Sequence, residues 1–159
     1  MKTAEDIVND KQGDIVFISW DQTVHQTCRK MIEKKIGAIV IKKDDEFVGI
    51  WTERDLLRNI LKPDFSIDTA RIGDYMSTPL YSAPHDAPLI KLEEMFVGLF
   101  VRHLMVEKDG EYIGLLSIGD VLRGSLLAKD EKIKELNSIA SWEYYENWGW
   151  DRRRESKKK

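Results

Sequence analysis

The pattern of apolar and polar positions predicts strands and helices in the order strand, helix, strand, strand, helix. Short apolar runs at residues 15–19, 38–41 and 47–51 are typical of buried strands. The polar residues 43–46 separate the last two runs and predict a hairpin. The first half of the chain therefore contains one compact unit that mixes α and β elements.

Helices are expected between and after these strands. Asp21 is a candidate N-cap for a helix that ends near Lys35, and Thr52 is a candidate N-cap for a helix over residues 53–60. The first of these helices has one apolar face, formed by Val24, Cys28, Met31 and Ile32.

The same order of elements recurs 65 residues later. Residues 15–58 align with residues 80–123 without a gap, and eight of the 44 aligned pairs are identical, among them Gly49/Gly114 and Asp55/Asp120. The second copy predicts strands at 80–83, 104–106 and 112–116, and helices at 87–100 and 118–127. Its hairpin turn contains Asp-Gly, a strong turn signal.

A repeat of this length predicts two copies of one supersecondary unit that bury their apolar faces against each other. The cleft between the copies is then a natural ligand site. We divide the chain into a lead-in (1–14), a first repeat (15–61), a linker (62–71), a second repeat (72–127) and a C-terminal helix with an aromatic and basic tail (128–159). A short helical turn is expected at 72–76.

Composition narrows the class of protein. A chain of 159 residues with 42% hydrophobic content suits one compact domain or two small halves that depend on each other. Its net charge of −3 gives no general attraction to nucleic acid or membranes. The lone Cys28 rules out a disulfide framework and fits a reducing cytoplasm, and no apolar run is long enough for a transmembrane segment. We expect a cytoplasmic protein.

The two copies resemble CBS domains, and together they resemble a CBS pair, or Bateman module. The resemblance covers about residues 2–135 and rests on the order of elements, on IGDYMSTP between the repeats and on VRHLMVEKDGEYIGLLSIGDV in the second. The stretch IGAIVI…GIWTERDLLR is similar to stand-alone bacterial and plant single-pair CBS proteins. The resemblance implies an α/β (α+β) fold of tandem β-α-β-β-α repeats with pseudo-two-fold symmetry. It also implies homodimerisation and an adenosine derivative as ligand.

Two equivalent aspartates are the predicted ribose ligands. One ionised carboxylate can accept hydrogen bonds from both adjacent hydroxyls of a ribose, and such charge-assisted bonds are stronger than neutral ones. The family places this Asp at the end of G-h-x-[ST]-x-x-D, which Thr52 with Asp55 and Ser117 with Asp120 match. The hydroxyls and the adjacent helix N-termini suit a phosphate. The alternative is that these residues only cap their helices.

The two half-sites differ where the middle strand of each repeat begins. The second copy has Arg102 and His103 where the first has Gly37 and Ala38. Arg102 is a fixed cation that can clamp a phosphate, and His103 can donate a hydrogen bond to one, more strongly when protonated. We therefore expect the second half-site to favour phosphorylated ligands. Gly37 and Ala38 supply backbone and space.

The first half-site is expected to depend on Arg54 for positive charge. The alternative is that these charged residues have no role in binding: the arginines are exposed on the surface, and the histidine ring forms hydrogen bonds with the neighbouring backbone.

No reaction is predicted from the sequence. The three histidines (His25, His85 and His103) lack metal-ligand spacing, and Cys28 lies on an apolar helix face. No catalytic triad, paired catalytic carboxylates or P-loop is present. The predicted function is therefore a regulatory module, not an enzyme, that binds an adenine nucleotide and transmits its state to a protein partner. AMP is the favoured ligand, and ADP, ATP, NAD and S-adenosylmethionine are alternatives.

The C-terminal tail leaves other functions open. A helix at 129–139 precedes a cluster of aromatic residues that consists of Trp142, Tyr144, Tyr145, Trp148 and Trp150. This segment is expected to fold over its own module or its dimer mate, with docking to a partner or a membrane surface as the alternative. Specific nucleic-acid binding is not expected. The alternative functions are scaffolding through this tail, and redox regulation through a thioredoxin-type partner.

Overall fold

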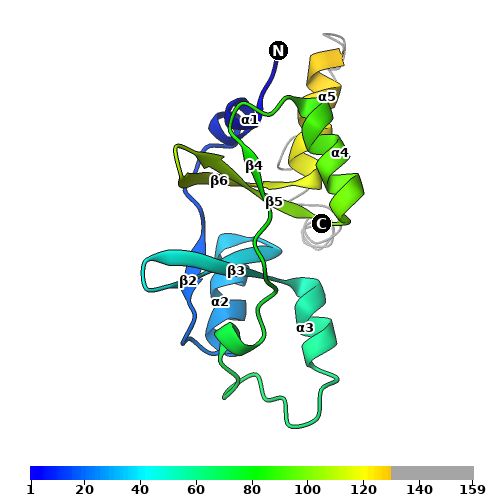
Figure 1. Ribbon diagram of the computed structural model, residues 1–159. Helices are drawn as coiled ribbons and strands as arrows, with labels where there is room; N and C mark the ends of the chain where they lie inside the picture. Colours follow the sequence, from blue (N-terminus) through cyan, green and yellow to red (C-terminus); the bar gives the residue numbers. More distant parts are fainter. Residues whose placement is uncertain (130–159) are drawn as a thin grey trace, which may run out of the picture.

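The computed structural model describes residues 1–129. Two small sheets, each with three strands, lie one above the other, and helices flank them (Figure 1). The predicted α/β class and tandem arrangement are confirmed by this order of elements. The predicted C-terminal helix and the aromatic cluster lie outside the described residues.

The first repeat forms a sheet in the order β1-β2-β3. Its elements are β1 (Phe17–Ser19), α2 (Val24–Lys34), β2 (Ala38–Lys43), β3 (Glu46–Thr52) and α3 (Glu53–Asn59). The prediction that Asp21 caps α2 is wrong. Thr23 is the N-cap and forms a reciprocal capping box with Gln26, whereas Asp21 accepts a hydrogen bond from Ser19 Oγ at 2.7 Å.

The second repeat forms the sheet β4-β5-β6 with the same connections. Its elements are β4 (Ser82–Pro84), α4 (Leu89–Leu99), β5 (His103–Lys108), β6 (Glu111–Ser117) and α5 (Ile118–Lys129), preceded by the short 3-10 helix η1 (Ile72–Asp74). The two hairpins match in detail. Each has a register shift at the equivalent place, after Ile41 in β2 and after Val106 in β5. The repeat in the sequence is therefore a repeat of backbone geometry.

Residues 1–14 are more than the lead-in that the sequence comparison predicted. Residues Ala4–Lys11 form helix α1, and Thr3 caps it through a capping box with Asp6. Figure 1 shows α1 beside the β4–β6 half of the molecule. Ala4 and Ile7 are buried in the core of the second repeat. The N-terminal residues thus complete the hydrophobic core of the second repeat.

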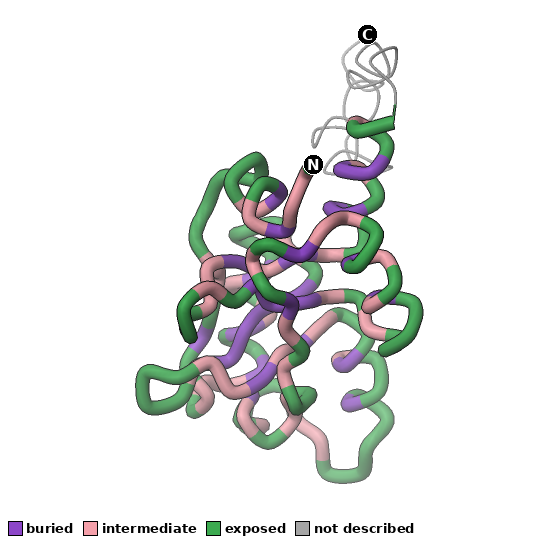
Figure 2. Tube along the Cα trace, turned by 45° about the horizontal axis from the view of Figure 1, so that its top comes forward, coloured by how far each residue is buried: buried purple, intermediate pink, exposed green. Residues whose placement is uncertain are grey.

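Each sheet has its own hydrophobic core, and in Figure 2 the buried residues follow the strands and the inner faces of the helices. Trp51 anchors the first core, with 1% of its surface exposed, and its Nε1 donates to Asn59 Oδ1 at 2.9 Å. Cys28 packs against this core, as its position on an apolar helix face predicts.

Candidate ligand-binding site

A cavity of about 510 Å³ lies between the two repeats. The first repeat contributes residues 34–38, at the end of α2 and the start of β2, and the second contributes His103, Gly114, Leu115 and Ser117. The third wall is the approach segment, which we define as Val8 and residues 11–16. This volume is in the range of small-molecule sites. The cavity therefore has the size and the two-repeat lining that a nucleotide site between repeats requires.

Four of the predicted site residues line this cavity together. Gly37 and Ala38 come from the first repeat, and His103 and Ser117 come from the second. Gly37 and Ala38 are adjacent in the sequence, and His103 lies beside Ser117 because these two residues pair between β5 and β6. Gly37 and Ala38 are the counterparts of Arg102 and His103 in the repeat of Asp55, yet they line the same cavity as His103.

Asp120 lies directly behind the cavity wall and is 4% exposed. Its Oδ2 accepts hydrogen bonds from Ser117 N at 2.7 Å and from Lys11 Nζ at 3.0 Å. In return, Asp120 N donates to Ser117 Oγ at 3.2 Å, which completes a helix cap. Its Oδ1 is buried and has no hydrogen-bond partner within residues 1–129. The capping alternative is thus part of the geometry, but it uses only one of the two carboxylate oxygens.

Asp55 occupies the equivalent place in the first repeat, and both of its oxygens have partners. Oδ2 accepts from Thr52 N at 2.9 Å and from Thr52 Oγ1 at 3.2 Å. Oδ1 accepts from Ser77 Oγ at 3.2 Å, and Arg58 Nη1 lies 3.6 Å from it. The two half-sites therefore differ in the acceptor capacity that remains for a ligand.

A second hollow of about 490 Å³ lies outside the space between the repeats. It is lined by residues between Phe17 and Lys34, all in the first repeat. Neither hollow is lined by Thr52 or Asp55 among the residues that the structure describes. The cavity between the repeats is the one that matches the predicted residues.

Arg102 and Arg54 are exposed, and neither lines the cavity in the part of the chain described. Their predicted roles as phosphate ligands stay predictions. The cations in the cavity wall are lysines that the sequence reasoning did not select, Lys11, Lys34 and Lys35, and within residues 1–129 the wall contains one aspartate, Asp14. The wall thus carries an excess of positive charge without the two arginines.

The protonation state of His103 follows from its surroundings. Burial lowers the pKa of His103 to about 4, and the positive charges of Lys11 and Arg102 add to this effect, while Asp120 opposes it. The imidazole is therefore neutral near pH 7, with one nitrogen that donates a hydrogen bond and one that accepts. In the ligand-free protein the stronger hydrogen bond of a protonated His103 is therefore not expected at mildly acidic pH.

One sequence pattern predicts the helix that carries Lys11. The T-x-x-D spacing of Thr3 and Asp6 is a capping-box pattern and predicts a helix that begins at Ala4. A helix there carries Lys11 to the cavity. Lys35 ends α2 in a left-handed conformation (φ 54°), which turns the chain into β2 at the cavity edge. No local pattern marks Lys34 or Lys35 as lining a site.

Within residues 1–129, no group of three or more His, Cys, Asp or Glu side chains is arranged to hold a metal ion. In the same part of the chain, no helix is both long enough and apolar enough to cross a membrane.

Comparison with known proteins agrees with this architecture. Residues 4–62 and 72–126 match the sequence model of the CBS domain. The mitochondrial CBS domain-containing protein CBSX3 of Arabidopsis thaliana is 29% identical over 151 residues, which cover 89% of this chain and 73% of CBSX3. Other plant relatives are longer, and the chain spans 22% of some of them.

Solved structures share the fold. The CBS domain protein NE2398 is 32% identical, with a TM-score of 0.71 over 79% of this chain and 98% of that protein. CBSX2, solved in complex with AMP, is 22% identical, with a TM-score of 0.62 over 77% of this chain and 98% of CBSX2. The latter likeness concerns the fold alone.

Proposed function

The chain belongs to the CBS domain family, and from this premise we propose that it is a regulatory module that binds an adenine nucleotide in the cavity between its repeats. The observation that carries the proposal is the carboxylate of Asp120. It lies behind the wall of a cavity of about 510 Å³, and its buried Oδ1 has no hydrogen-bond partner within the described chain. A buried acceptor without a partner is costly, and a ribose hydroxyl would satisfy it.

The remaining wall suits the other parts of a nucleotide. Ile15, Val16, Ile36 and Leu115 offer apolar surface to a purine ring. Lys34 and Lys35 offer charge to a phosphate, and Ser117 and neutral His103 offer hydrogen bonds. AMP is the first candidate because it needs only these contacts, and the AMP complex of CBSX2 supports the choice.

Calorimetric titration tests the proposal. We expect AMP to bind the wild-type protein, and ADP, ATP, NAD and S-adenosylmethionine are compared under the same conditions. Asp120→Asn should weaken binding, because the amide carries no charge and presents one acceptor oxygen. Asp109→Asn is the matched control: this residue lies in a hairpin turn at φ 51°, which asparagine tolerates. If none of these ligands binds the wild type, the proposal fails.

We propose that the module acts as a homodimer through the outer faces of its helices. Helices α4 and α5 lie side by side in Figure 1 and expose a set of large apolar residues, namely Ile90, Val97, Leu99, Phe100, Ile118, Leu122 and Leu126. Several large apolar side chains exposed on two neighbouring helices are typical of an interface. A second copy is the occupant we favour, since it would present the same apolar helices. A ligand that changes the angle between the repeats would change the geometry of this interface, and thereby the binding of a protein partner that contacts it.

The redox alternative finds little support in the described residues. Burial raises the pKa of the Cys28 thiol, which favours the unreactive protonated form. The scaffolding alternative concerns the tail, outside the described residues. We propose the cytoplasm as the compartment of this protein. CBSX3 is a mitochondrial protein, so fractionation of cells that produce the native gene product should test whether the protein is found in the cytoplasm or in an organelle.

A further inference from the structure

Lys11 forms an ion pair with Asp120, the carboxylate that the proposed ligand would bind. Its Nζ lies 3.0 Å from Asp120 Oδ2 and 3.2 Å from the carbonyl oxygen of Leu115. The lysine side chain is 38% exposed, whereas that of Asp120 is 1% exposed. Lys11 is thus the more exposed partner of this ion pair. Lys11 lines the cavity, whereas the carboxylate that it contacts is buried.

The vicinal hydroxyls of a ribose place two donors close together, and a carboxylate receives them best with both oxygens. Oδ1 of Asp120 is buried and has no hydrogen-bond partner among the described residues, but Oδ2 already accepts from Ser117 N and from Lys11 Nζ. A ligand that takes both oxygens must therefore displace Lys11. The displaced ammonium loses its ion pair with the buried carboxylate, and a phosphate brought into the same cavity would replace that pair.

A nucleoside offers Lys11 no such anion, whereas a nucleotide carries one into the same cavity. The wall there is already basic, since Lys34 and Lys35 also line it and Asp14 is the one aspartate among its described residues. Resting on the function proposed above, we propose that Lys11 is a specificity-determining residue: it leaves Asp120 when a ligand enters and pairs with the ligand's phosphate. The ligand class is then phosphorylated nucleosides, not adenosine or the cationic S-adenosylmethionine.

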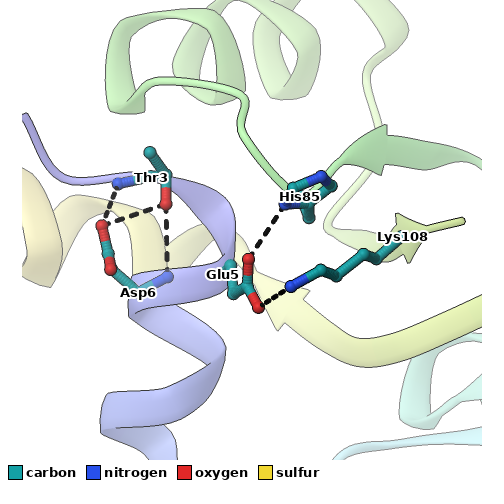
Figure 3. Close-up of polar contacts among 5 residues, drawn as sticks. All are labelled: Thr3, Glu5, Asp6, His85 and Lys108. Carbon is teal, nitrogen blue, oxygen red and sulfur yellow. Dashed lines mark hydrogen bonds and ion pairs between the residues drawn. The ribbon is translucent and has the colours of Figure 1, made fainter.

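The rest of α1 is held in place, so that the exchange is confined to the end of the helix. Figure 3 shows Glu5 between His85 and Lys108 of the second repeat: Glu5 Oε2 lies 2.9 Å from His85 Nδ1, and Glu5 Oε1 accepts from Lys108 Nζ at 2.6 Å. These contacts lower the pKa of Glu5, which keeps it ionised. Gln12, directly after Lys11, has a positive φ of 49° and turns the approach segment toward β1.

The test compares AMP with adenosine in the wild type and in Lys11→Met, which keeps the aliphatic stem and removes the charge. We expect AMP to bind Lys11→Met about tenfold more weakly, the effect of one charge-assisted contact. Adenosine should bind the variant at least as tightly as it binds the wild type, because the competitor for Asp120 is gone. Lys91→Met is the control, since Lys91 pairs with Glu94 on the surface of α4, and it should change neither affinity.

Equal weakening of both ligands would assign Lys11 a merely structural role, and an unchanged preference for AMP would likewise overturn the inference. A second measurement separates this inference from the proposed function. Inorganic pyrophosphate is titrated into the protein while the NMR signals of the His103 ring are followed. If AMP does not bind but pyrophosphate shifts these signals in the wild type and not in Lys11→Met, Lys11 recognises phosphate although the adenine proposal fails. If pyrophosphate causes no shift either, both fail.

Discussion

Ile7 and Ile72 stand 65 residues apart, at equivalent positions of the two repeats, and each is buried in the core of the opposite repeat. Ile7 of α1 packs with the second sheet, and Ile72 of η1 packs with the first. Their exposed fractions are 5% and 0%. The segment that precedes each repeat therefore fills the core of the other, so neither core is complete within its own repeat.

This exchange predicts that the two repeats unfold together. Ile7→Ala should lower the free energy of unfolding by about 2–4 kcal/mol, the cost of a cavity at a buried isoleucine. Urea denaturation, followed by tryptophan fluorescence and by circular dichroism, should give one coincident transition. Ile32→Ala is the control, because Ile32 is 76% exposed and should change the stability little. A variant in which the second repeat melts first would contradict the exchange.

The two aspartates should differ in their effect on AMP. Asp120→Ala is expected to weaken binding by about 1.5–3 kcal/mol, the range for hydrogen bonds to a charged group. Asp55→Ala should leave binding at the described cavity nearly unchanged, since both oxygens of Asp55 have protein partners and, unlike the partners of Asp120, those residues do not line the cavity. Calorimetry that reports the number of sites decides between these outcomes. An equal loss in both variants would mean that the half-sites are equivalent ligand sites.

Much of this fold follows from the alternation of apolar and polar residues. Both hairpins and the helices after them lie close to their predicted positions, because strand and helix periodicity is local information. Helix α1 was missed since the alignment of the two copies begins at residue 15, and the equivalent of α1 before the second repeat is only the short turn at Ile72. A comparison of the two repeats therefore does not indicate a helix at the N-terminus.

The site was harder to predict than the fold. The motif located Asp120 and Ser117, because both lie in one helix cap. Lys11 is 109 positions from Asp120, and their contact depends on how α1 packs against β6 and α5. The predicted cations Arg54 and Arg102 are next to motif residues in sequence, yet their side chains are exposed. Adjacency in sequence does not fix the direction of a side chain.

The apolar faces of α4 and α5 predict a dimer that one charge can disrupt. Val97 and Leu122 are 70% and 52% exposed, and both belong to this face. Val97→Glu and Leu122→Glu should each convert a dimer into a monomer at micromolar concentration, because a carboxylate buried in an apolar interface lacks a partner. Analytical ultracentrifugation measures the change. Ile67→Glu, at an exposed position in the linker, should remain dimeric. A wild-type monomer would contradict the prediction at the outset.

Stability should fall as the pH is lowered through the range in which His103 is protonated only in the unfolded chain. Burial, with the charges of Lys11 and Arg102, lowers the pKa of His103 from 6.5 to about 4, and Asp120 opposes this shift. The unfolded chain therefore binds this proton first, and the contribution of neutral His103 is complete above pH 6.5 and is lost between pH 6.5 and 4. The loss is about 3 kcal/mol at most, since each pKa unit corresponds to 1.36 kcal/mol.

Urea denaturation at intervals between pH 7 and 4 measures this dependence. His103→Gln keeps a polar side chain of similar size and cannot titrate, so its stability should fall less steeply over the same interval. In Lys11→Met the pKa of His103 should rise, because the second-largest cause of its depression is removed, and the steep part of the curve should narrow. Parallel curves for the wild type and His103→Gln would show that carboxylates alone govern the acid response, and that His103 is not held neutral by the cavity.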